Sequence, residues 1–151
     1  MSGRRVTIVD DDAATLALLR DILEADGFEV VVSTSVGADL RELWASRPDL
    51  LIVDLLLTTD TRGLSGWDVV RLARAHADLH RVPAIVISAD YPGLRRHERE
   101  AGRMDRVRLL PKPFGVEELR EVVVALLSPQ VEAPRAIGGD REAINRAPGP
   151  G

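Results

Sequence analysis

The sequence predicts an α/β fold in which helices cover both faces of a doubly wound parallel sheet. Short apolar runs alternate with helix-like segments five times along the chain, and this alternation is typical of parallel strands connected by helices. The length of 151 residues, with 45% hydrophobic and 29% charged residues, is that of a globular protein with one core. We therefore expect a single α/β domain.

The predicted strands are short apolar runs, each followed directly by a polar residue except the last, which is followed by Pro111 and then Lys112. They lie at residues 6–9, 29–32, 50–53, 84–87 and 107–110. Runs of this length that are apolar at nearly every position are typical of strands buried on both faces.

The first two predicted helices follow the first two strands. Leu16, Leu19 and Leu23 lie at helical spacing, Asp12 is placed to cap this helix, and Gly27 is placed to end it. The second predicted helix contains apolar residues at the same spacing and ends before Pro48. These residues are Val36, Leu40 and Leu43.

Three more helices are predicted at residues 66–78, 94–101 and 116–127. The last of them has a predicted buried side formed by Val116, Leu119, Val123 and Leu126. From Ser128 the chain is rich in Pro, Gly and polar residues without a hydrophobic period. We therefore expect a domain over residues 4–128 and a disordered tail over residues 129–151.

Composition also bounds the location and the chemistry. No apolar run approaches the roughly 20 residues of a membrane-spanning helix, and the N-terminus has no secretory hydrophobic segment, so we expect a cytoplasmic protein that binds no membrane. The chain has no cysteine, which excludes thiol catalysis. A net charge of -4 does not suggest a nucleic-acid surface. An arginine-rich stretch over residues 95–108 is interpreted as a solvated helix face and loop.

The residues that follow the strands carry the candidate chemistry. Parallel sheets of this kind bind ligands at the carboxyl ends of their strands. The polar residues at those ends are Asp10, Asp11, Asp12, Asp54, Ser88 and Lys112. Lys112 is the only lysine among 20 Lys and Arg residues, so we expect a specific role for it. The three histidines have no partner at ligand spacing, and we interpret His76, His80 and His97 as surface residues without a catalytic role.

This set of side chains is suited to phosphoryl transfer. Clustered carboxylates repel one another and favour a bound cation, and oxygen ligands without nearby His or Cys indicate Mg²⁺. An Asp carboxylate can act as a covalent nucleophile. Ser88 can donate a hydrogen bond to a phosphoryl oxygen, and Lys112 can supply a positive charge there.

In order and approximate spacing, these motifs resemble the receiver domains of response regulators in two-component signalling. They are Ile-Val-Asp-Asp-Asp at residues 8–12, Asp54 after the third strand, Ser88-Ala89 after the fourth and Lys112-Pro113-Phe114 after the fifth. The resemblance covers residues 4–128. It implies a flavodoxin-like receiver fold with strand order 2-1-3-4-5.

The resemblance also implies roles for single residues. Asp54 is the phosphoacceptor, and Mg²⁺ is bound directly by Asp11, mostly through water by Asp10, by Asp54 itself, and by the main-chain carbonyl of Leu56. Lys112 is expected to contact the phosphoryl group.

Ser88 is expected to be the switch hydroxyl of the family, and the Lys112–Pro113 bond is expected to be cis. Asp12 is interpreted as the cap of the first helix rather than as a direct metal ligand.

The function that the resemblance implies is a phosphorylation-activated switch. Its phosphoryl donor would be a histidine kinase or a phosphotransfer protein, and we expect a stand-alone receiver that catalyses only its own phosphorylation and dephosphorylation. A downstream protein would bind the surface formed by the fourth helix, fifth strand and fifth helix. No direct nucleic-acid binding is expected, and the resemblance leaves a homodimer open.

The sequence departs from the family pattern in three places. The loop after Asp54 is about four residues longer than usual and contains Asp60 and Arg62; we interpret it as a surface insertion. Leu109 occupies the place of the Tyr or Phe that turns inward in many receivers. Leu56 puts an apolar side chain beside the acceptor, which suggests the hypothesis of a long-lived phosphoryl group.

Three alternatives remain. A degenerate receiver would keep the fold and bind partners without accepting phosphate. A phosphatase of the haloacid-dehalogenase type would need a second Asp where Leu56 stands. A flavodoxin-like flavin binder would need phosphate-binding residues after the first strand, where three carboxylates would repel the ligand.

Overall fold

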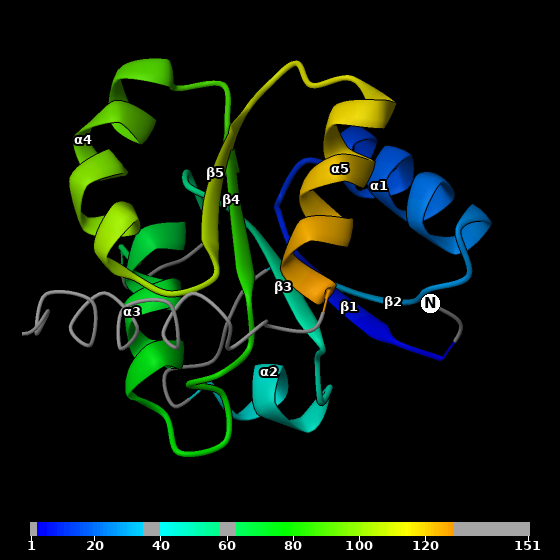
Figure 1. Cartoon of the computed structure of the whole chain (residues 1–151), viewed down its shortest axis with the longest axis horizontal. Helices are drawn as coiled ribbons and strands as arrows, with labels where there is room; N and C mark the ends of the chain where they lie inside the picture. Colours follow the sequence, from blue (N-terminus) through cyan, green and yellow to red (C-terminus); the bar gives the residue numbers. More distant parts are fainter. Residues whose placement is uncertain (1–2, 35–39, 58–62, 129–151) are drawn as a thin grey trace, which may run out of the picture.

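The structure is a computed structural model that describes residues 3–34, 40–57 and 63–128. Five parallel strands form one sheet in the order β2-β1-β3-β4-β5 (Figure 1). The strands are β1 (Arg5–Val9), β2 (Glu29–Ser33), β3 (Leu50–Asp54), β4 (Ala84–Ser88) and β5 (Val107–Pro111). The predicted fold class and strand order are confirmed.

Helices cover both faces of this sheet (Figure 1). They are α1 (Ala13–Ala25), α2 (Arg41–Ala45), α3 (Gly66–Ala75), α4 (Tyr91–Arg103) and α5 (Val116–Leu127). The core is divided in two by the sheet: one cluster packs under α1 and α5, and the other packs under α2, α3 and α4. The central strands β3 and β4 are buried along their whole length, which explains their uninterrupted apolar runs.

The predicted ends of α1 are confirmed. The side chain of Asp12 accepts a hydrogen bond from the Ala14 N–H at 3.3 Å, which satisfies one of the unpaired donors of the first turn. Gly27 follows the helix with φ 93°, a conformation that favours glycine. Local capping chemistry therefore sets both ends of the helix that follows the three aspartates.

Two helices differ from their predicted bounds. α3 ends at Ala75 rather than at residue 78. The reason is that the ring of His76 accepts the Asp78 N–H at 3.0 Å, a donor that would bond to the Arg74 carbonyl in a longer helix. α4 begins at Tyr91, three residues before the predicted start, because Asp90 caps it by accepting the Gly93 N–H at 3.1 Å.

Two expectations about buried helix faces are also revised. Val116 is 41% exposed and does not belong to the buried side of α5; it begins the helix, so no earlier turn shields it. α2 is short because Leu40 has φ 58° and precedes the helix rather than lying within it, although Leu40 and Leu43 are both buried as expected.

Some predictions lie outside the described residues: the tail at 129–151, Val36, and the loop residues Asp60 and Arg62. Within the described residues, none of the helices combines the length and the apolar character that crossing a bilayer requires.

Candidate functional site

The carboxyl ends of the strands are aligned, so their polar residues lie along one edge of the sheet. Asp54 is the last residue of β3 and pairs with Ile87 of β4, and Ser88 pairs with Pro111 of β5. The ladder continues past the last strand, since the Lys112 N–H donates to the Ser88 carbonyl at 2.8 Å.

Lys112 joins the first and third strands. Its Nζ lies 2.7 Å from Asp54 Oδ2 and 3.2 Å from Asp10 Oδ2. The Lys112 side chain is 18% exposed, whereas those of Asp10 and Asp54 are 0% and 9% exposed. One ammonium therefore holds two largely buried carboxylates.

The other oxygen of each carboxylate is held by the main chain. Asp54 Oδ1 accepts the Leu56 N–H at 2.9 Å, and Asp10 Oδ1 accepts the Asp12 N–H at 2.9 Å. Both acids are thus fixed in orientation, with one oxygen on an amide and the other facing Lys112.

The ionisation of this group follows from burial and from its neighbours. Burial raises the pKa of Asp10 above its usual 3.8, and the charge of Asp54 raises it further, against the lowering effects of the Asp12 amide and of Lys112. Burial by itself would lower the pKa of Lys112, but the hydrogen bond and charge of Asp54, followed by those of Asp10, raise it above the usual 10.5. The ammonium is therefore charged at neutral pH.

Ser88 lies on the neighbouring strand end. It is completely buried, and its Oγ accepts the Asp90 N–H at 2.9 Å. Because Asp90 caps α4, the hydroxyl is connected to the start of that helix by one hydrogen bond. Among the described residues, no side-chain hydrogen bond joins the Ser88 hydroxyl to Asp54 or to Lys112.

The donor set of the site fits a hard cation. Asp11 follows Asp10 at the end of β1 and is half-buried. The expected metal ligands offer only carboxylate and main-chain carbonyl oxygens. The described residues contain no preformed cluster of three or more His, Cys, Asp or Glu side chains around a metal position. Mg²⁺ is commonly held by one or two carboxylates, with water and phosphate oxygens completing its octahedron.

Sequence reasoning missed Thr15. Its Oγ1 donates to Asp12 Oδ2 at 2.6 Å and lies 3.5 Å from Lys112 Nζ, and the first of these bonds is the main reason why the pKa of Asp12 is lowered. The available signal was that Thr15, a hydroxyl residue, lies four positions before Leu19 and so falls on the apolar side of the first helix.

It also missed Gly66, which begins α3. A side-chain Cβ at this position would lie 2.0 Å from the Asp54 carbonyl oxygen, and the Gly66 N–H donates to the Leu55 carbonyl at 2.8 Å. Only glycine allows the helix to begin this close to the end of β3.

A groove opens beside the lysine. It is lined by Thr15, Leu18, Ala89, Lys112, Pro113 and Phe114, and it is mostly apolar apart from the hydroxyl and the amine. The Lys112–Pro113 peptide bond in its wall is cis, as expected. The groove gives a reacting group access to the only lysine.

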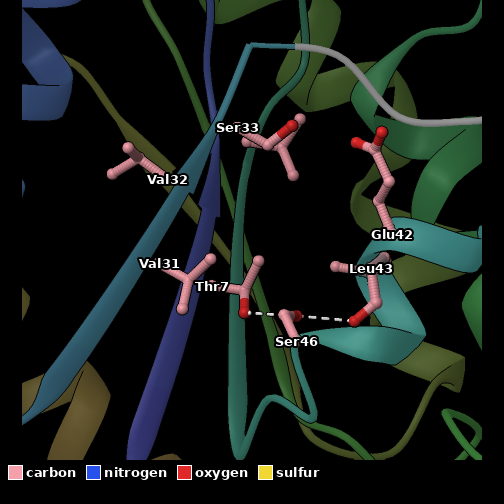
Figure 2. Close-up of a pocket in the computed structure, with 8 residues that line it drawn as sticks. Thr7, Val31, Val32, Ser33, Glu42, Leu43 and Ser46 are labelled. Carbon is pink, nitrogen blue, oxygen red and sulfur yellow. Dashed lines mark hydrogen bonds between the residues drawn. The ribbon is translucent and has the colours of Figure 1, made fainter.

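A second pocket, between β1, β2 and α2, contains none of the predicted site residues (Figure 2). Two of its hydroxyl groups are paired: Ser46 Oγ lies 2.8 Å from Thr7 Oγ1 and donates to the Leu43 carbonyl at 2.6 Å. These bonds attach α2 to the sheet, and the pocket carries no cluster of reactive groups.

Two histidines, His76 and His97, are half-buried rather than surface residues, whereas His80 is exposed as expected. His97 is half-buried, and its ring stacks on Trp67 with centroids 4.8 Å apart. His76 accepts a main-chain hydrogen bond, as described above, and neither residue lies in the group around Lys112.

Comparison with known proteins finds response regulators, both by family profile and by sequence identity. The family profile described as "Response regulator receiver domain" matches residues 6–124. The phosphate regulon transcriptional regulatory protein PhoB of Rhizobium meliloti is 35% identical over 124 residues, which are 82% of this chain and 52% of PhoB. Response regulator MprA of Mycobacterium ulcerans is 36% identical over 125 residues, which are 82% of this chain and 50% of MprA. The chain thus spans about half the length of these curated relatives.

Among solved structures, response regulator TrrA of Thermotoga maritima is similar with a TM-score of 0.67 and 25% identity. The match covers 82% of this chain and 99% of TrrA, and TrrA was crystallised in complex with Mg²⁺-BeF.

Proposed function

Because the chain belongs to the family of response regulator receiver domains, we propose that it is a signalling switch that accepts a phosphoryl group on Asp54. The observation that carries this proposal is the contact of Lys112 Nζ with Asp54 Oδ2 at 2.7 Å, at the edge of the sheet that also presents Asp10 and Ser88. The proposed donor is the phosphohistidine of a histidine kinase or of a phosphotransfer protein.

The transfer is a single displacement at phosphorus. An oxygen of Asp54 forms the new O–P bond as the P–N bond of the phosphohistidine breaks, and the bonding electron pair leaves with the imidazole. The ammonium of Lys112 would interact with the phosphoryl oxygens as negative charge moves to them from the carboxylate. The Ser88 hydroxyl, at the end of the neighbouring strand, would donate a hydrogen bond to one of these oxygens. The product is an acyl phosphate.

Asp10, Asp11, Asp54 and the carbonyl of Leu56 are the residues proposed to hold Mg²⁺. When bound, the cation would neutralise the charge that repels an anionic donor from these carboxylates. The Mg²⁺-BeF complex of TrrA supports Mg²⁺ as the cation.

The proposal extends to partners. We propose that a downstream protein binds the surface of α4, β5 and α5, without direct nucleic-acid contact by this domain. Exposed arginines on α4 and β5 bring positive charge to one part of that surface, which suits acidic groups of a partner, while α5 presents the exposed Glu117, Glu118 and Glu121. The arginines are Arg95, Arg96, Arg99, Arg103 and Arg108.

Chemical phosphorylation tests the central step. Incubation with acetyl phosphate and Mg²⁺, followed by intact mass measurement and peptide mapping, should place one phosphoryl group on Asp54. Asp54→Ala should abolish uptake, and Asp21→Ala, which removes an exposed carboxylate of α1, should not. Absence of uptake by the unaltered protein would favour the degenerate receiver, and continuous turnover of a phosphate ester would favour the phosphatase.

A further inference from the structure

The helices α3 and α4 are joined by a polar contact outside the group around Lys112. The Glu100 carboxylate of α4 accepts Arg71 Nε at 2.8 Å and Arg71 Nη2 at 2.6 Å. Its Oε2 also accepts the indole N–H of Trp67 at 2.8 Å. The hydrogen bond from Arg71 is the main reason that the pKa of Glu100 is lowered to about 2.

Trp67 is the centre of this contact. It is 1% exposed, and its ring stacks on His97 of α4 with an interplanar angle of 21°. His97 and Glu100 are three residues apart and therefore lie on one side of α4. We call Trp67, Arg71, His97 and Glu100 the α3–α4 latch.

The latch begins next to the phosphoacceptor. Trp67 follows Gly66, whose backbone is packed so closely on the Asp54 carbonyl that a Cβ would lie 2.0 Å from that oxygen. The start of α3 therefore cannot shift without moving the main chain of Asp54. Asp54, Gly66, Trp67 and Glu100 form an uninterrupted connection between the end of β3 and the middle of α4.

In many receivers a Tyr or Phe that turns inward couples the site to α4, and in this protein Leu109 stands in its place. Leu109 is partly buried and packs into the cluster under α2, α3 and α4, where a leucine has no ring to reorient. The latch reaches the same helix from α3, with an indole that has both a packed face and a hydrogen-bond donor.

We propose that the α3–α4 latch couples the state of Asp54 to the position of α4. The latch contacts are formed in the unphosphorylated protein. They break when Ser88 and Lys112 move to bind the phosphoryl group. This inference rests on the proposed function, since it needs Asp54 to accept a phosphoryl group. By linkage, weakening the latch must favour phosphorylation by the same factor by which phosphorylation weakens the latch.

The test uses Trp67 as its own reporter. The chain has two tryptophans, so Trp44→Phe leaves Trp67 alone and serves as the parent protein. Glu100→Gln removes the charge that Arg71 and Trp67 share, and Arg71→Met breaks the same pair from the exposed side of α3. Glu98→Gln is the matched control, because it removes an exposed carboxylate of the same helix.

Each protein is titrated with acetyl phosphate and Mg²⁺ while the phosphorylated fraction and Trp67 emission are recorded. In the parent, emission should change in proportion to phosphorylation. Glu100→Gln and Arg71→Met should begin near the phosphorylated emission and reach half-maximal phosphorylation at about 3- to 10-fold less acetyl phosphate. Glu98→Gln should behave as the parent does.

The outcomes separate the two proposals. If the parent is phosphorylated while Trp67 emission stays constant, or if folded Glu100→Gln and Arg71→Met titrate like Glu98→Gln, the latch is overturned and the switch stands. If the parent takes up no phosphoryl group, the proposed function fails and the latch with it.

Discussion

Asp10 and Asp54 are each held at both oxygens, one by a main-chain amide and the other by Lys112. An ammonium in this place offsets the repulsion between two carboxylates that have lost most of their water. It also occupies oxygens that a divalent cation would use. We therefore expect Lys112 to have opposite effects on the proposed metal binding and on the proposed phosphoryl transfer.

Replacing Lys112 with Met should separate these effects. Without the ammonium, we expect Mg²⁺ to bind about tenfold more tightly, equivalent to about 1.4 kcal/mol, as measured by titration calorimetry. Uptake from acetyl phosphate should slow on the order of 100-fold, because a charge that follows the phosphoryl oxygens is lost. Arg108→Met, which removes an exposed cation of β5, the strand just before Lys112, should change neither. Unaltered magnesium affinity in Lys112→Met would contradict the competition.

Leu56 should control how long the phosphoryl group survives. Its amide is fixed to Asp54 and its side chain is 49% exposed, so it lies at the solvent side of the acceptor. In Leu56→Asn a polar amide can orient an attacking water, and dephosphorylation should be about tenfold faster. Leu72→Asn, which alters a leucine of α3 that is 40% exposed, is the control. Equal or slower decay in Leu56→Asn would refute the effect.

At the scale of elements, the junction between β3 and α3 is the tightest part of the site. Gly66→Ala would place a methyl group 2.0 Å from the Asp54 carbonyl, so we expect a loss of about 3 kcal/mol or more in the free energy of unfolding. Gly102→Ala adds the same atom within α4, where nothing lies within 4 Å, and should stabilise by about 0.5–1 kcal/mol. Urea denaturation measures both. Similar results for the two substitutions would show that the junction can relax.

The contact between α3 and α4 should respond to acid. The pKa of Glu100 is lowered from 4.5 to about 2, first of all by its hydrogen bond with Arg71, so the ionised contact stabilises the fold fully above pH 4.5. That contribution is lost as the pH falls from 4.5 towards 2. The difference in the free energy of unfolding between the unaltered protein and Glu100→Gln should therefore shrink from pH 6 to pH 3. A constant difference would mean that the carboxylate charge does not stabilise the contact.

Strand positions could be predicted because buried parallel strands are apolar at nearly every residue, and each observed strand contains its predicted run. Helix ends depended on single contacts. The ring of His76 ends α3, and this competition between a side chain and the backbone has no signature in the hydrophobic period. Asp90 was a readable cap for α4, but the weak apolar pattern between Tyr91 and Leu94 concealed the first turn.

In the candidate site, the residues at strand ends could be predicted because topology alone brings them to one edge. Thr15 could not be placed from chemistry, since its contact with Lys112 depends on how α1 packs on the sheet. Trp67 and Glu100 lie 33 positions apart, and only the packing of α3 beside α4 shows that they are partners.

For the whole molecule, the sheet separates two clusters that share no side chains. Ile8→Val alters the cluster under α1 and α5, and Val70→Ala alters the cluster under α2, α3 and α4. Each should cost about 1–3 kcal/mol, and the double variant should equal their sum within about 0.5 kcal/mol in urea denaturation. A larger deviation would show that the sheet transmits strain between its faces.

The single lysine also provides a spectroscopic opportunity. Every other cation of the chain is an arginine or a histidine, so biosynthetic labelling with ¹⁵N-lysine would give one side-chain amine signal. That nucleus would report from between Asp10 and Asp54, without any substitution, on the arrival of a metal ion or a phosphoryl group.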